Sequence, residues 1–330
     1  MTARFDVLGI GNAIVDVIST VDDGFLTDNG LIKGSMQLIN EAQAQSIYDI
    51  MGPGTEVSGG SAANTVAGLA SFGGKAAFFG KVKSDQLGRV FRHDISAAGV
   101  SFETPGADYG SETARCLILV TPDGERTMNT YLGACIEFGP EDIDETVVRD
   151  SKVIYMEGYL WDPEQAKLAF LKAAEIAREA GREVSLSLSD SFCVDRHRSS
   201  FLELIRRDVD ILFANEDEIK SLYQVESFDE ALQAVRKDCK LAALTRSGAG
   251  SVIVSHDEVH VVEARKVEKL VDTTGAGDLY AAGFFAGYTN DKTLAQCAQL
   301  GSLAASEVIS HIGARPRISL KDLASQNGLL

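Results

Sequence analysis

Short runs of apolar and β-branched residues alternate along the chain with longer segments that carry a helical pattern. The short runs predict strands at Phe5–Ile10, Ala77–Val82, Val153–Met156, Val184–Ser189, Asp210–Phe213 and Leu241–Thr245, then a hairpin at Ser251–Val254 and Val259–Val262. The longer segments predict helices at Ser61–Phe72, Gln86–Ala98, Pro163–Ala180, Phe228–Lys237, Thr274–Tyr288 and Thr293–Ser310. This alternation indicates parallel βα units, so we expect an α/β core with a mostly parallel central sheet.

Two stretches, residues 15–40 and 103–131, interrupt this rhythm with strand-like segments and no helix between them. In the second stretch, a Thr-Pro-Asp-Gly turn at 121–124 separates two such segments, which predicts a β-hairpin. We therefore expect one α/β domain, whose core comprises residues 1–14, 41–102 and 132–330. Residues 15–40 and 103–131 are expected to form a small β-sheet lid over the substrate site.

The chain has 330 residues, of which 45% are hydrophobic, and a formal net charge of −17. Such an acidic protein repels nucleic acid and anionic membrane surfaces, and no apolar stretch approaches the ~20 residues that span a bilayer. The five cysteines show no CxxC spacing, which predicts reduced thiols and a cytoplasmic protein. We expect no nucleic acid and no membrane among its partners, and local positive groups at any site for an anion.

Two segments are similar to common nucleotide-binding motifs but lack residues that those motifs need. Gly9 lies near the end of a predicted strand and Gly11 follows it, yet Ile14 stands where a dinucleotide-binding turn has its third glycine. Gly73-Gly74-Lys75 has no glycine at the required upstream position, and Ala76 replaces the hydroxyl that binds magnesium in a P-loop. If the protein uses ATP, it therefore binds it through another motif.

The strongest candidate for chemistry is the turn Gly275-Ala276-Gly277-Asp278 at the start of a predicted helix. Glycines at a helix N-terminus expose backbone N–H groups to one point, and together with the helix dipole they form an anion hole. A carboxylate beside this hole can accept the proton of an attacking hydroxyl while the hole stabilises phosphoryl oxygens. Alternatively, Asp278 is only a helix-start carboxylate favoured by the dipole.

A second glycine turn precedes another predicted helix. Gly59 and Gly60 permit the backbone to approach a ligand closely, and Ser61 is a candidate cap of the helix. Asn64, in its first turn, can offer a two-sided amide to a sugar hydroxyl. The alternative for Asn64 is a local cap or a buried structural amide.

Polar and small residues also follow two strands in the second half of the chain. Asn215 and Glu218 supply hard oxygen atoms that suit Mg²⁺ held mostly through water. A small-residue loop that could lie along a polyphosphate contains Thr245, Ser247, Gly248 and Gly250. The structural alternatives are an acid-rich helix start and a plain turn between strands.

These segments occur in the order found in the ribokinase-like carbohydrate and nucleoside kinases, which the chain resembles along nearly its whole length. Residues 59–64 and 272–284 are similar to the family's two signatures, and 215–218 and 245–250 resemble its NxxE motif and its ATP-phosphate loop. The resemblance implies a ribokinase-like fold with a three-layer α/β/α core and a small β-sheet lid. It also implies ATP as donor, Asp278 as general base and Mg²⁺ reached through water from Glu218. The implied contacts to ATP are those of Asn215, Thr245, Ser247, Gly248, Gly250 and Thr274.

The N-terminal block 9–17, with 25–26 and 31–34, resembles the adenosine-kinase branch of this family. The resemblance implies that Asp16 binds the ribose 2′- and 3′-hydroxyls and that the 5′-hydroxyl of adenosine is phosphorylated. Asn12, Gly60, Ser61 and Asn64 would lie nearby. A carboxylate accepts hydrogen bonds from both hydroxyls of a diol, in agreement with this role. That branch is often monomeric, so we expect a monomer or a weak dimer.

Four more residues receive roles from their position, and Thr274 receives a second one. Tyr159 and Trp161, after a predicted strand, are candidates for a wall against the nucleoside base, and Arg126 is a candidate for steadying the transferred phosphoryl group. Asp272 and Thr274 lie where members of the family often bind a monovalent cation such as K⁺. A sugar kinase acting on ribose or fructose, an inosine or guanosine kinase, and a catalytically silent binding protein stay open as alternatives.

Overall fold

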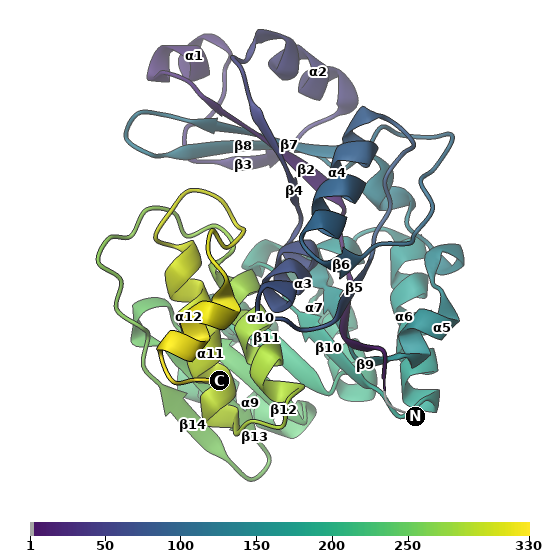
Figure 1. Cartoon of the computed structure of the whole chain (residues 1–330), viewed down its shortest axis with the longest axis vertical. Helices are drawn as coiled ribbons and strands as arrows, with labels where there is room; N and C mark the ends of the chain where they lie inside the picture. Colours follow the sequence, from purple (N-terminus) through teal and green to yellow (C-terminus); the bar gives the residue numbers. More distant parts are fainter. Residues whose placement is uncertain (1–2) are drawn as a thin grey trace.

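The computed structural model describes residues 3–330, which form a large sheet covered by helices on both faces and a smaller sheet beside it (Figure 1). The large sheet has the order β14 (Val259–Val262), β13 (Ser251–Ser255), β12 (Leu241–Thr245), β11 (Ile211–Asn215), β10 (Glu183–Ser187), β9 (Ser151–Glu157), β1 (Phe5–Ile10), β5 (Ala76–Phe79) and β6 (Val100–Ser101). Neighbouring strands are parallel except in the pairs β12–β13 and β13–β14. The predicted mostly parallel sheet is confirmed.

Each face of the large sheet packs against its own set of helices. On one face lie α3 (Ser61–Ser71), α10 (Ala276–Tyr288), α11 (Leu294–Val308) and α12 (Leu320–Gln326). On the other lie α5 (Glu145–Arg149), α6 (Glu164–Glu179), α7 (Ser191–Asp208), α8 (Glu216–Tyr223) and α9 (Phe228–Asp238). Successive strand residues enter opposite cores, as Val7 and Leu8 do. Burial on both faces explains why these strands read as continuous apolar runs.

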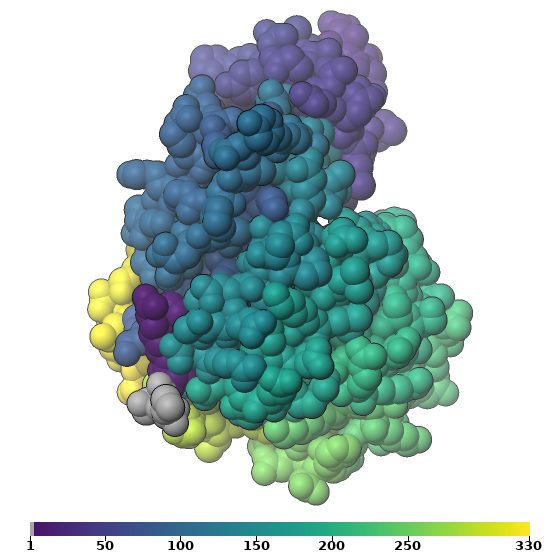
Figure 2. Space-filling view, turned by 90° about the vertical axis from the view of Figure 1, so that its right-hand side faces the viewer, coloured from purple at the N-terminus to yellow at the C-terminus, as the bar shows by residue number. Residues whose placement is uncertain are grey.

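The smaller sheet has the order β3 (Met36–Leu38), β8 (Arg126–Tyr131), β7 (Ala114–Val120), β2 (Ile14–Thr20) and β4 (Thr55–Gly59). Helices α1 (Asp23–Asp28) and α2 (Glu41–Ile50) cover one face, and α4 (Gln86–Ala97) packs near β4. Together with α1 and α2, this sheet forms a separate lobe in the space-filling view (Figure 2), which we propose as the lid. Strand β4 and helix α2 come from a segment that the sequence assigned to the core, because Thr55–Gly59 is too short and polar to read as a strand.

Two chain connections between the core and the lid cross at one point, which we call the hinge crossing (residues 11–13 and 59–60). Gly60 has a positive φ of 97°. A Cβ at this position would lie only 2.0 Å from the backbone carbonyl oxygen of Asn12. The close approach that Gly60 permits is therefore to another part of this chain, and only glycine fits there.

Every strand and helix that the sequence predicts for the core is present in the structure. Strands β1, β12 and β14 have the predicted bounds, and all six predicted helices are confirmed to within two residues at each end. Helix α7 was missed. Its middle, residues 195–200, is entirely polar and separates the apolar residues at 192–194 from those between 201 and 205, so no continuous helical pattern is visible. Within residues 3–330, no helix is both long and apolar enough to cross a membrane, and the five cysteines are free and buried.

Candidate active site

Polar residues gather where the parallel strands of the large sheet end. Asn12 follows β1, Glu157 ends β9, and Asn215 and Thr245 are paired at the ends of β11 and β12. Because β1 runs almost directly into β2, this edge of the sheet faces the lid (Figure 1). Ligands of open α/β sheets bind outside the carboxyl ends of the strands, so the site is expected here.

The glycine turn before α10 is built for close packing. Gly275 is the N-cap of α10 with φ 77°, and a Cβ there would lie 2.7 Å from the Cβ of Ala314. The helix begins at Ala276, two residues later than predicted, and Asp278 lies in its first turn. The first N–H groups of a helix have no partner within it, so the turn 275–277 has the character of an anion site.

The carboxylate of Asp278 is held by two donors from α3. Ser61 Oγ donates to Oδ1 at 2.6 Å, and Asn64 Nδ2 donates to Oδ2 at 2.9 Å. Burial raises the pKa of Asp278 to about 6, although these two hydrogen bonds oppose the shift. The structure thus joins the two glycine turns that the sequence showed separately, with the candidate base between them.

This arrangement changes the local role of Ser61. The N-cap of α3 is Gly60, not Ser61, and Gly60 has no side chain to cap the helix. The predicted cap is therefore wrong, and the hydroxyl of Ser61 serves Asp278 instead. Asn64 uses its amide N–H on Asp278, whereas its Oδ1 is buried and has no hydrogen-bond partner among the described residues. An acceptor left in this state suits the hydroxyl of a bound ligand.

Glu157 supplies the missing cap, and sequence reasoning did not find it. Its carboxylate accepts from the backbone N–H of Ala62 at 2.9 Å and from Asn12 Nδ2 at 2.7 Å. Burial raises the pKa of Glu157 to about 7, and the two donors oppose that shift. The residue therefore fixes both the start of α3 and the amide of Asn12. A lone glutamate at a strand end gave no signal in the sequence, because only the fold shows its burial.

Asp16 lies on the lid, next to the hinge crossing. A Cβ on Gly59 would come within 2.6 Å of Asp16 Oδ2, so the glycine makes room for this carboxylate. Burial raises the pKa of Asp16 to about 6, opposed first by Arg126 and then by Arg315, and reinforced by Asp278. Arg315, which the sequence did not single out, thus lies close to both carboxylates of the site.

The face of the lid that carries Asp16 is otherwise mostly apolar. We call it the inner face of the lid; it comprises Ile14, Asp16, Ile18, Cys116, Ile118, Val120, Arg126, Met128 and Thr130. The opposite face, with Val15 and Leu117, packs against α1 and α2. At the β3 edge, Met36 and Leu38 are 49% and 58% exposed. An apolar face therefore lies beside a buried carboxylate; its middle is buried, with Ile118 2% exposed, and it reaches solvent at the β3 edge.

Arg126 connects the lid to the segment before α10. Its Nη1 donates to Asp272 Oδ2 at 2.8 Å and to Thr274 Oγ1 at 2.6 Å. Its Nε and Nη2 are buried and have no partner among residues 3–330. Asp272 also accepts from the backbone N–H groups of Thr274 and Gly313. Because Arg126 already neutralises Asp272, we do not propose a monovalent cation at this carboxylate.

The residues predicted to contact ATP and Mg²⁺ lie along the same edge. Asn215 and Glu218 form a capping box at the start of α8, in which each side chain accepts from the other residue's backbone N–H. Burial raises the pKa of Glu218 to about 7. The loop after β12 contains Ser247 with φ 49° and Gly250 with φ 89°. In the described part of the chain, no three His, Cys, Asp or Glu side chains are grouped to bind a metal directly.

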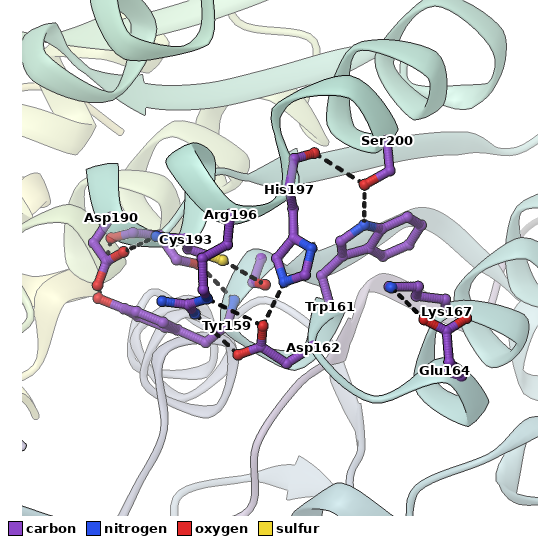
Figure 3. A network of polar contacts seen from close by, with 12 residues as sticks. Tyr159, Trp161, Asp162, Glu164, Lys167, Asp190, Cys193, Arg196, His197 and Ser200 are labelled. Atoms are coloured by element: carbon purple, nitrogen blue, oxygen red, sulfur yellow. Dashed lines mark hydrogen bonds and ion pairs between the residues drawn. The ribbon is translucent and has the colours of Figure 1, made fainter. Parts of the chain in front are cut away.

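The two aromatic candidates behave differently, as Figure 3 shows, with Asp162 between them. Tyr159 is 37% exposed, and its hydroxyl donates to the carbonyl of Ser189 at 3.1 Å, which fixes the ring at the sheet edge. Trp161 is 4% exposed, stacks on Phe201 and donates to Ser200 Oγ at 2.9 Å. Trp161 belongs to the hydrophobic core, so its predicted place in a base-binding wall is corrected.

A buried carboxylate beside the N-terminus of a helix is an arrangement that suits phosphoryl transfer to a hydroxyl, so the fold and the site agree with a small-molecule kinase. The sequence comparison gives the same class. Residues 47–320 match the pfkB family of carbohydrate kinases, and the chain belongs to that family.

Three relatives illustrate the range of similar proteins. The adenosine kinase structure from Sinorhizobium meliloti is 58% identical, with a TM-score of 0.92 and coverage of 98% of this chain and 100% of the other. A probable sugar kinase protein from Rhizobium etli CFN 42 is 55% identical, with a TM-score of 0.93 and full coverage of both chains. Adenosine kinase 2 of Arabidopsis thaliana is 26% identical over 93% of this chain and 94% of its own length. The chain is thus an adenosine-kinase-like or sugar kinase of the family.

Proposed function

We propose that the protein transfers the γ-phosphoryl group of ATP to the 5′-hydroxyl of adenosine, giving AMP and ADP. The observation that carries the choice of a nucleoside is the apolar inner face of the lid beside Asp16. A free sugar presents hydroxyls in every direction and would leave them unpaired against this surface. A purine riboside presents a diol to Asp16 and a flat apolar ring to Ile118 and Met128.

In this proposal, the residues act in a defined order. Asp16 and the unpartnered Oδ1 of Asn64 hold the ribose, and Tyr159 offers its exposed ring from the core side. The lid excludes water and brings Arg126 to the phosphoryl group. Asp278 accepts the proton of the 5′-hydroxyl as this oxygen attacks the γ-phosphorus, and the turn 275–277 stabilises the phosphoryl oxygens.

The proposal includes Mg²⁺, which neutralises the negative charge of ATP phosphates when it is bound. Hard oxygen donors are available at the sheet edge, since Glu218 and Asn215 lie there close to Asp190. A buried, hydrogen-bonded glutamate suits contact through water better than direct ligation, so we assign these residues to water-mediated binding. The reduced, buried cysteines agree with a cytoplasmic setting, which is also part of the proposal.

A substrate panel tests this function directly. ADP formation from MgATP is measured with adenosine, inosine, guanosine, cytidine, ribose and fructose. Burial of roughly 100 Å² of a purine ring contributes about 2.5 kcal/mol, so kcat/KM for adenosine should exceed that for ribose by roughly 70-fold. Preference for ribose or fructose would keep the class but overturn the nucleoside. Absence of turnover with every substrate would favour the silent binding protein.

The pH dependence of the reaction should report Asp278. A general base must be ionised, and the pKa of Asp278 is raised to about 6. We therefore expect kcat to be level from pH 7 to 8 and to fall about tenfold for each pH unit below about 6. The measurement is a kcat profile between pH 5 and 8 with both substrates saturating. A rate that stays constant down to pH 5 would contradict the role of Asp278.

A further inference from the structure

Arg315 is fixed beside the anion turn, although neither the sequence nor the proposed mechanism uses it. It belongs to the segment that follows α11. In this segment Gly313 N–H donates to Asp272 Oδ2 at 2.9 Å. Ala314 packs so tightly on Gly275 that a Cβ added to Gly275 would lie 2.7 Å from the Cβ of Ala314. These two contacts leave the backbone of Arg315 little freedom. The backbone of Arg315 is therefore held by the core.

The guanidinium of Arg315 reaches from the anion turn toward the hinge crossing. Its Nη2 donates to Ser58 Oγ at 3.0 Å, two residues before Gly60. Its Nε is buried and has no hydrogen-bond partner among the described residues. An unpaired buried donor on a charged group is costly, and such groups in native structures are commonly completed by a ligand or water.

The charges around Arg315 describe what this donor faces. Burial lowers the pKa of Arg315 to about 10, opposed by Asp94, Asp16 and Asp278 in that order, so the group stays protonated at neutral pH. Asp94 is itself engaged, because Ser58 N–H donates to its Oδ2 at 2.7 Å. The other two carboxylates are Asp16, which is proposed to bind the ribose, and Asp278, which is proposed to accept the proton of the 5′-hydroxyl. A phosphoryl group arriving beside them adds negative charge that a fixed cation offsets.

We propose that Arg315 is a phosphate-binding residue of the active site, which contacts the phosphoryl group during transfer and the 5′-phosphate of the nucleoside monophosphate product. The inference rests on the proposed function. Arg126 belongs to lid strand β8, whereas the backbone of Arg315 is anchored in the core and only its guanidinium contacts the lid, at Ser58. The site therefore keeps one cation for the product phosphate even when the lid moves away, and product release depends on Arg315.

The test compares a neutral ligand with its phosphorylated form. Adenosine and AMP are titrated separately by calorimetry into the wild type, R315Q and the control R317Q, which alters an exposed arginine of the same segment. Loss of a charge-assisted hydrogen bond should weaken AMP binding to R315Q at least about tenfold, with adenosine affinity changed less than about threefold. R317Q should bind both ligands as the wild type does.

Two further variants separate binding from support of the fold. S58A removes the hydrogen bond at 3.0 Å but keeps the guanidinium, so it should leave the ratio of the two affinities unchanged. R315K keeps the positive charge but loses the planar guanidinium, which can bind a phosphate through two N–H groups. It should lower the affinity for AMP selectively, by about threefold to fivefold. It serves as the test if R315Q does not fold. Equal losses for both ligands, or unchanged AMP affinity, would overturn the role of Arg315. Absence of adenosine binding by the wild type would instead contradict the proposed nucleoside.

Discussion

Replacing Asp278 with Asn is expected to lower kcat by roughly 10²–10⁴-fold, because the general base is lost while its surroundings stay in place. The asparagine can keep both contacts. Its Oδ1 can accept from Asn64 as the aspartate does. Its Nδ2 can donate to the hydroxyl oxygen of Ser61, so this hydrogen bond is kept with its direction reversed. The affinity for adenosine should therefore change less than about threefold.

Turnover is measured as ADP formation, and affinity is measured by calorimetry without ATP. Asp257→Asn, which alters an exposed carboxylate in the turn between β13 and β14, is the matched control and should have wild-type kcat. A D278N enzyme that keeps kcat within tenfold of the wild type would remove Asp278 from the reaction. A loss of affinity as large as the loss of kcat would assign it to binding.

Gly60→Ala should be the most damaging single-methyl change at the hinge crossing. The new Cβ would lie 2.0 Å from the carbonyl oxygen of Asn12, and φ is 97°. Because this oxygen belongs to the backbone, the clash cannot be relieved by a change of side-chain rotamer. We expect the free energy of unfolding to fall by roughly 3 kcal/mol or more. The turnover of adenosine should fall as well, since Asn12 and Asn64 flank the displaced turn.

Gly124→Ala provides the matched control. Gly124 has a comparable φ of 87°, but a Cβ there would have nothing within 4 Å. Its cost should be the backbone strain alone, about 1–2 kcal/mol, with little change in kcat/KM. Denaturant unfolding and steady-state kinetics of both variants measure the difference. Equal losses of stability would show that the contact with Asn12 contributes nothing.

The large sheet could be predicted because its strands are buried on both faces. Runs such as Phe5–Ile10 and Leu241–Thr245 need no knowledge of their neighbours, since every side chain meets a helix layer. The glycine turn at 275–277 could be predicted equally well, because the backbone conformation that requires glycine depends only on neighbouring residues. Strand β4 was missed for the opposite reason. Its pairing with β2 depends on a distant segment and not on its own composition.

The residues that complete the site were harder to predict, because their roles depend on burial and direction. Glu157 reads as the polar end of a strand until the fold places Asn12 and Ala62 against it. Arg315 reads as a loop cation until Ala314 packs on Gly275. Trp161 was assigned to the site for its chemistry. The short turn after β9 sends its indole into the helix layer instead. No sequence pattern specifies that direction.

The carboxylate proposed as the general base belongs to a pair of core helices, α3 and α10, that contact each other without the lid. Asp278 on α10 is held by Ser61 and Asn64 on α3, and the two helices approach so closely at Gly68 that a Cβ there would meet Leu279 at 2.6 Å. The orientation of the Asp278 carboxylate is thus independent of the position of the lid. In the proposed enzyme, a water molecule that enters while the lid is open meets an aligned base but no Arg126. Protection of ATP against wasteful hydrolysis would then depend on the charge that the lid delivers, and a viscous solvent would slow exchange of substrates without disturbing the alignment.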